Sequence, residues 1–88
     1  MIIRYHRVFE KKFASLQPRI RTKVIAALEQ FQRNPYDPDL KNHALKGPFI
    51  GKRAFHVTGD IRIMFLEQGG YAVVLMLKAG THAQVYGK

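Results

Sequence analysis

The spacing of apolar residues changes period near the middle of this chain, and that change constrains the fold more than any other feature. Residues 9–16 and 20–31 carry apolar side chains at helical spacing, with basic residues between them. Residues 52–57 and 61–66 instead follow the two-residue period of strands. Helices followed by strands predict an α+β fold in which a helical pair covers one face of a sheet.

Proline and glycine residues mark the ends of these elements. Pro18 suits the first turn of the second helix, and Asn34-Pro35 ends it because a residue before proline leaves the helical region. Thr58-Gly59-Asp60 and Gln68-Gly69-Gly70 are predicted turns. The expected order is β-α-α-β-β-β in a mainly antiparallel sheet, over residues 2–6, 9–16, 18–33, 52–57, 61–66 and 71–77.

Length and charge narrow the class of protein. A chain of 88 residues forms one domain, residues 1–88, and its 47% apolar residues are enough for a packed core. Fifteen Lys and Arg against six Asp and Glu give a net charge of +9. Residues 1–34 hold eight of the basic residues. This imbalance predicts a polyanionic partner, of which nucleic acid is the usual one.

The remaining composition indicates a small soluble protein of the cytoplasm. Cysteine is absent, so disulfides and thiolate metal sites are excluded. No apolar run approaches the ~18 residues of a membrane span, and the charged start MIIRYHRVFEKKF is not typical of a signal peptide. We therefore expect no membrane association.

Titratable side chains are concentrated in the loops and strand ends of the second half. His43, His56, Asp60 and His82 lie there, whereas His6 lies beside the first strand without a motif around it. For each histidine taken alone, a surface or structural role is the simpler interpretation. Asp60 taken alone is most simply a turn residue. As a set in a basic domain they fit metal-free RNA cleavage. Such cleavage needs a base for the 2′-hydroxyl, a cation for the phosphorane and an acid for the leaving oxygen.

The stretch FQRNPYDPDLKNHALKGPFIGKRAFHVTGDIRIMF, followed by a strand and GTHAQVY, resembles the RelE/ParE toxin superfamily. Within it, the YafQ-like branch of mRNA interferases is the closest match. The shared features are the NP-x-x-P-x-L turn, L-x-x-H-x-L-x-G, G-x-R-x-x-H-[IV], an Asp four residues later, and GTH followed by an aromatic. The resemblance spans essentially the whole chain and implies a microbial ribonuclease-like fold.

The resemblance also implies a role for individual residues. Its catalytic set falls on His43, His56, Asp60, His82 and Tyr86, with Tyr86 replacing the usual Phe and keeping a ring that can stack on a base. His82 is the favoured acid or base, His43 or His56 its complement, and Asp60 orients a histidine. No cofactor and no metal are expected. The expected RNA-binding residues are Arg53, Arg62, Lys52 and Lys46, of which Arg53 could instead be structural.

Three functions from different classes follow. The first is a toxin of a type II toxin–antitoxin system that cleaves mRNA on the ribosome and is neutralised by a cognate antitoxin. The second is a ParE-like inhibitor that binds DNA gyrase, for which the histidine set is not needed. The third is a zinc enzyme or zinc-bound structural protein, because three His and one Asp could form a tetrahedral site. This third function does not explain why the protein is so strongly basic.

Overall fold

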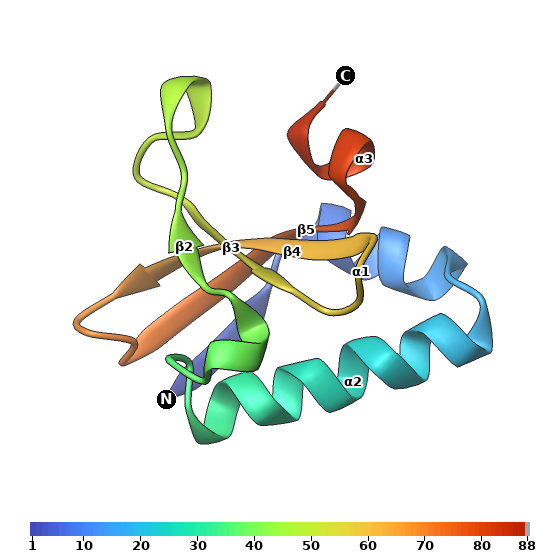
Figure 1. Cartoon of the computed structure of the whole chain (residues 1–88), viewed down its shortest axis with the longest axis horizontal. Coiled ribbons are helices and arrows are strands. Elements are labelled where there is room, and N and C mark those ends of the chain that lie inside the picture. Colours follow the sequence, from blue (N-terminus) through green and yellow to red (C-terminus); the bar gives the residue numbers. More distant parts are fainter. Residues whose placement is uncertain (88) are drawn as a thin grey trace.

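A computed structural model describes residues 1–87 and shows a five-stranded sheet with helices on both faces (Figure 1). Lys88, the last residue of the predicted domain, lies outside the described residues. No helix in the described chain is both long and apolar enough to cross a membrane. The elements are β1 (Ile2–Tyr5), α1 (Arg7–Ser15), α2 (Pro18–Arg33), η1 (Pro38–Leu40), β2 (His43–Ala44), η2 (Gly47–Phe49), β3 (Arg53–His56), β4 (Ile61–Gln68), β5 (Val73–Thr81) and α3 (His82–Tyr86).

The sheet has the strand order β1-β5-β4-β3-β2. β1 is parallel to β5, and the other neighbouring pairs are antiparallel. The predicted α+β class, the helical pair and the mainly antiparallel sheet are thus confirmed. The apolar run near the C-terminus is an interior strand, as its hydrophobicity on both faces predicts.

The predicted start of that strand at Tyr71 is wrong by two residues. Gly69, Gly70 and Tyr71 all have positive φ angles, of 65°, 62° and 71°, so the turn continues through Tyr71. The Tyr71 amide donates to the Glu67 carboxylate (2.8 Å), which stabilises this conformation in a non-glycine residue. Val73 is therefore the first residue of β5.

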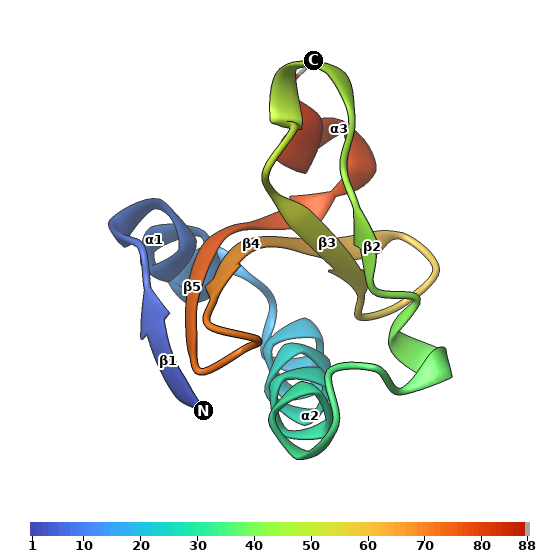
Figure 2. The ribbon, with the colours of Figure 1, turned by 90° about the vertical axis from the view of Figure 1, so that its left-hand side faces the viewer.

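The hydrophobic core lies between α2 and the face of the sheet that α2 covers. The Phe31 ring on α2 packs against Phe55 and Phe65, with ring centroids 4.7 and 5.0 Å apart. Phe9 of α1 joins the same buried cluster. Figure 2 shows α2 on one side of the sheet, with α3 and the loop between β2 and β3 on the other. This second side is called the open face below.

Four elements were not predicted: the two-residue strand β2, the short helices η1 and η2, and the short helix α3. α3 begins with a capping box, in which the Thr81 hydroxyl accepts the Gln84 amide (3.2 Å) and the Gln84 side chain accepts the Thr81 amide (2.9 Å). Gly80 has a φ of +148°, and a Cβ there would lie 2.6 Å from Oε1 of Gln84. The chain thus needs glycine at this point to turn into α3.

Candidate active site on the open face of the sheet

Strand register places three of the predicted residues on the open face. His56 is the cross-strand partner of Arg62, and His43 is the partner of Ala54. Partners in an antiparallel pair share a face, and Phe55 between Ala54 and His56 is in the core. His43, His56 and Arg62 therefore project from the side of the sheet opposite α2.

The imidazole rings of His43 and His56 lie edge to face, with centroids 6.1 Å apart. Nδ1 of His43 donates a hydrogen bond to the Lys41 carbonyl oxygen at 2.8 Å, because a carbonyl can only accept. In neutral His43 the lone pair is then on Nε2. The loop conformation thus leaves Nε2 of neutral His43 able to accept a proton.

Asn42, which precedes His43, ties this loop to the sheet. Its side-chain amide donates to the Tyr71 hydroxyl (2.9 Å) and to the Pro35 carbonyl (3.1 Å). Nε of Arg53 donates to Oδ1 of Asn42 (3.0 Å). Arg53 shares its face with Phe55 rather than with the histidines, so its observed contact is structural. The sequence motif gave no sign of Asn42 as an anchor.

Burial is the main cause that lowers the pKa of His56, and the charges of Arg62, of His43 in its protonated form and of Lys41 lower this pKa further. The Arg62 guanidinium donates through Nη1 to the carbonyls of Thr58 (3.0 Å) and Gly59 (2.9 Å), which fixes it beside the histidine. A lowered pKa keeps His56 neutral near pH 7, the form that can accept a proton.

α3 holds two more of the predicted residues of the site, His82 and Tyr86. The His82 ring contacts the Tyr86 ring with centroids 4.5 Å apart, as expected for residues four apart on a helix. Tyr86 also contacts Phe49 of η2 across the open face, at 5.5 Å. Burial raises the pKa of Tyr86, while the positive charge of Arg62 acts in the opposite direction. Arg62 therefore lies within electrostatic reach of both His56 and Tyr86.

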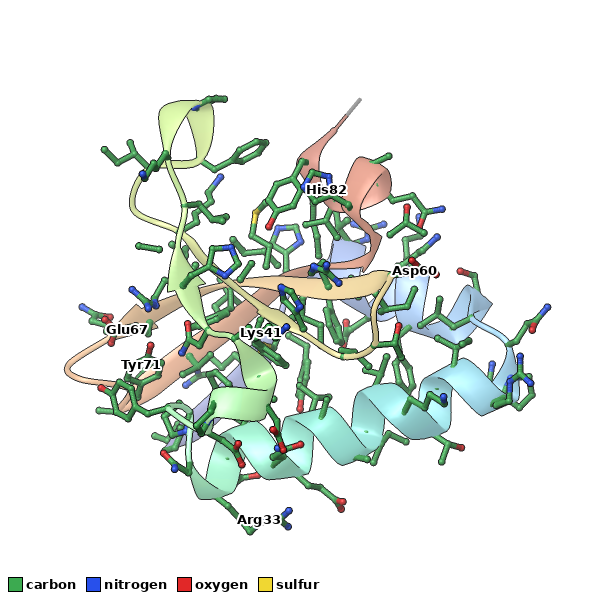
Figure 3. All side chains as sticks on the ribbon, viewed as in Figure 1. Arg33, Lys41, Asp60, Glu67, Tyr71 and His82 are labelled. Atoms are coloured by element: carbon green, nitrogen blue, oxygen red, sulfur yellow. The ribbon has the colours of Figure 1, made fainter. Side chains whose placement is uncertain are left out.

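Asp60 occupies the exposed turn between β3 and β4. Its amide donates to the Thr58 hydroxyl (3.2 Å), and no hydrogen bond joins its carboxylate to a histidine within residues 1–87. Figure 3 shows Asp60 at the end of the sheet and His82 above it. Nor do three His, Asp or Glu side chains of the described chain come together as a metal site, so the geometry does not support the zinc alternative.

Several basic residues surround this face. Nζ of Lys52 lies 5.9 Å from the Phe49 ring centroid, and Lys46 is exposed at the start of η2. The charge of Lys41 helps to lower the pKa of His56, but no motif in the sequence singles this lysine out. Most of the basic cluster in residues 1–34 is instead on α1 and α2, as for Arg33 below the sheet in Figure 3.

Solved structures of small bacterial toxins share this fold. The crystal structure of YafQ from Escherichia coli matches with a TM-score of 0.80 and 24% identity, covering 97% of each chain. The YoeB/ParE toxin from Agrobacterium tumefaciens matches with a TM-score of 0.76 and 16% identity, covering 93% of this chain and 99% of that one. A crystal structure of the Escherichia coli DinJ–YafQ toxin–antitoxin complex matches with a TM-score of 0.78 and 24% identity. The match covers 97% of this chain and 96% of that one.

The family model described as "Bacterial toxin of type II toxin-antitoxin system, YafQ" matches residues 1–87. The chain therefore belongs to the YafQ family of type II toxin–antitoxin toxins. No curated protein sequence matches it significantly. The resemblance inferred from the His/Asp pattern and the closing GTH segment is confirmed at the level of the family.

Proposed function

We propose that this toxin is an endoribonuclease that cleaves mRNA on the ribosome without a metal ion. In the cleavage step, the 2′-oxygen of one nucleotide bonds to the adjacent phosphorus, and the bond from phosphorus to the 5′-oxygen of the next nucleotide breaks. The proton of the 2′-hydroxyl passes to a base, and an acid protonates the 5′-oxygen. The products are a 2′,3′-cyclic phosphate and a 5′-hydroxyl end, and no water is consumed.

The observation that carries this proposal is the position of His56 on the open face, beside an Arg62 guanidinium that two backbone carbonyls hold. His56 is assigned the role of general base because burial and nearby cations lower its pKa. Arg62 neutralises charge on the phosphorane, for which a guanidinium held by two carbonyls is preorganised. His43 assists at the base, since its Lys41 contact leaves Nε2 able to accept a proton.

His82 is assigned the role of general acid, and Tyr86 stacks on a base at the cleavage site. Their contact at 4.5 Å supports a common role, because one helix would position both. The negative charge of the Asp60 carboxylate acts on the site through its electrostatic field, rather than through a hydrogen bond to a histidine. Lys46 and Lys52 contact RNA phosphates, whereas the observed contact of Arg53 favours a structural role.

A cognate antitoxin is the expected protein partner. The Escherichia coli relative is seen in a complex with DinJ, described as a toxin–antitoxin complex. We expect an antitoxin to hold this chain inactive in the cytoplasm until it is removed. Binding of a purified candidate antitoxin, followed by loss of cleavage activity, tests this part of the proposal.

The end groups of the products test the chemistry. Ribosomes programmed with an mRNA are incubated with the purified chain, with and without a zinc-selective chelator that leaves ribosomal Mg²⁺ in place. Polynucleotide kinase should label the new 5′ ends directly, and the 3′ ends should carry cyclic phosphate in both samples. A 5′-phosphate, or loss of cleavage with the chelator, would contradict the metal-free mechanism. Inhibition of gyrase without RNA cleavage would favour the ParE-like alternative instead.

A further inference from the structure

A hollow of about 140 Å³ lies on the open face beside the loop that carries η2. Apolar and basic groups both line it. The apolar side chains are Val8, Phe49, Met64 and Leu77, and the basic ones are Lys52, Lys78 and His6. None of the proposed acid or base residues lines this hollow, and Lys78 and His6 have no role in the mechanism above.

A β-bulge in β5 directs Lys78 to the hollow. Phe65 pairs with Met76 and Met64 pairs with Lys78, so Leu77 is an extra residue between two paired positions. Met76 and Ala79 are both buried in the core. In a regular strand Lys78 would share the face of Met76 and point into that core. The bulge instead places it on the face of Met64, and bulges often redirect side chains next to functional sites.

Phe49 connects the hollow to the candidate active site. Its ring contacts Tyr86 at 5.5 Å and lies 5.9 Å from Nζ of Lys52. Gly47 and Gly51 on either side of Phe49 have positive φ angles, of 62° and 91°, which favour glycine and shape the loop that presents the ring. Phe49 is therefore a wall shared by the hollow and the site around Tyr86.

His6 contributes a hydrogen-bond donor. Nδ1 of His6 accepts the Val8 amide at 3.0 Å and so caps α1. The proton of the neutral ring is then on Nε2, which can donate to an acceptor. The hollow thus combines an aromatic wall, an apolar floor, two ammonium groups and one ring N–H.

From this combination we infer that the hollow binds one nucleotide of single-stranded RNA, next to the nucleotide held at Tyr86. The base packs on Phe49 and Leu77, and Lys52 and Lys78 neutralise the phosphate. Aromatic rings bind any base through its π-face, and Lys contacts follow the backbone, so this subsite would tolerate different sequences. The inference rests on the proposed function, because it takes RNA to be the substrate.

The test uses a short 2′-O-methyl RNA, which the proposed mechanism cannot cleave, so binding is measured apart from catalysis. Phe49→Ala should weaken binding by about 5- to 150-fold, the range for loss of one base–aromatic stack, and Phe49→Trp should retain it. Ile50→Ala is the matched control in the same loop, since Ile50 is 79% exposed and does not line the hollow. Its affinity should equal that of the wild type.

Lys78 is tested through salt dependence. Lys78→Met should make the slope of log affinity against log salt less negative by about 0.7, and Lys78→Arg should restore it. Circular dichroism checks that each variant is folded. The inference is overturned if folded Phe49→Ala and Lys78→Met bind the RNA as the wild type does.

The two proposals can fail separately. If the wild type leaves mRNA on ribosomes intact while Phe49→Ala and Lys78→Met still weaken binding of the 2′-O-methyl RNA, the nuclease function is wrong and the nucleotide site stands. If the wild type cleaves mRNA while neither variant changes RNA binding, the nuclease function stands and the nucleotide site is wrong.

Discussion

Val85 attaches α3 to the rest of the protein, and replacing it tests whether this helix positions the site. The side chain is fully buried, at 0% exposure, and α3 contacts β4 and β5. A helix of five residues is too short to be stable alone. Val85→Ala should therefore loosen the element that carries His82 and Tyr86.

The magnitude follows from the buried surface that is lost. Val to Ala removes two methyl groups, worth about 1.6 kcal/mol at ~0.8 kcal/mol per buried carbon. The cavity left behind adds to this, so the free energy of unfolding should fall by about 2–3 kcal/mol. In a domain of this size the melting temperature should then fall by about 10–20 °C. Val8→Ala is the matched control, because Val8 is 47% exposed and should change stability by less than ~0.5 kcal/mol.

Denaturant unfolding measures the stability change, and hydrogen exchange of the α3 amides reports local opening. Cleavage of ribosome-bound mRNA, compared at equal amounts of folded protein, measures the effect on function. Val85→Ala should exchange its α3 amides faster and cleave more slowly, with Val8→Ala equal to the wild type in stability. Equal stability of Val85→Ala and Val8→Ala, or full cleavage activity with an open α3, would refute the reasoning.

Three further predictions concern the charge beside His56, the capping of α3 and the effect on translation in cells. Arg62→Gln removes a cation that lowers the pKa of His56, so this pKa should rise and the acidic limb of the cleavage rate should move to higher pH. An NMR titration showing an unchanged His56 would contradict this. Thr81→Ala should lower the free energy of opening α3, measured by hydrogen exchange of its amides, by about 1 kcal/mol, and Thr81→Ser should lower it much less. Equal opening free energies of the two variants would exclude capping by the hydroxyl. Expression without antitoxin should stop incorporation of labelled amino acids, and continued incorporation would exclude translation as the target.

Much of the fold could be predicted because periodicity and turn residues agree along most of the chain. The helical pair and the turn at Thr58–Asp60 follow from such local signals. β2 could not be predicted, since two residues carry no period and their pairing with β3 depends on tertiary contacts. α3 is too short for periodicity, although the spacing of Thr81 and Gln84 is a capping-box signal in the sequence.

The residues of the candidate site were proposed from the sequence, but the way in which they group in space could not be predicted from it. Pairing of His56 with Arg62 follows from the predicted hairpin. The contact of His43 with His56 requires β2, and the contact of Phe49 with Tyr86 requires both the β2–β3 loop and α3. Phe49 therefore had no signal in the sequence beyond being an aromatic residue in a loop.

The central claim, proton transfer by histidine, is tested most directly by the cleavage rates of His56→Gln and His82→Gln on mRNA-programmed ribosomes. Glutamine can form hydrogen bonds but cannot take up and release a proton near neutral pH. At equal folded protein by circular dichroism, each variant should cleave about 10²- to 10⁴-fold more slowly than the wild type. A rate near that of the wild type in both variants would contradict acid–base catalysis by these histidines.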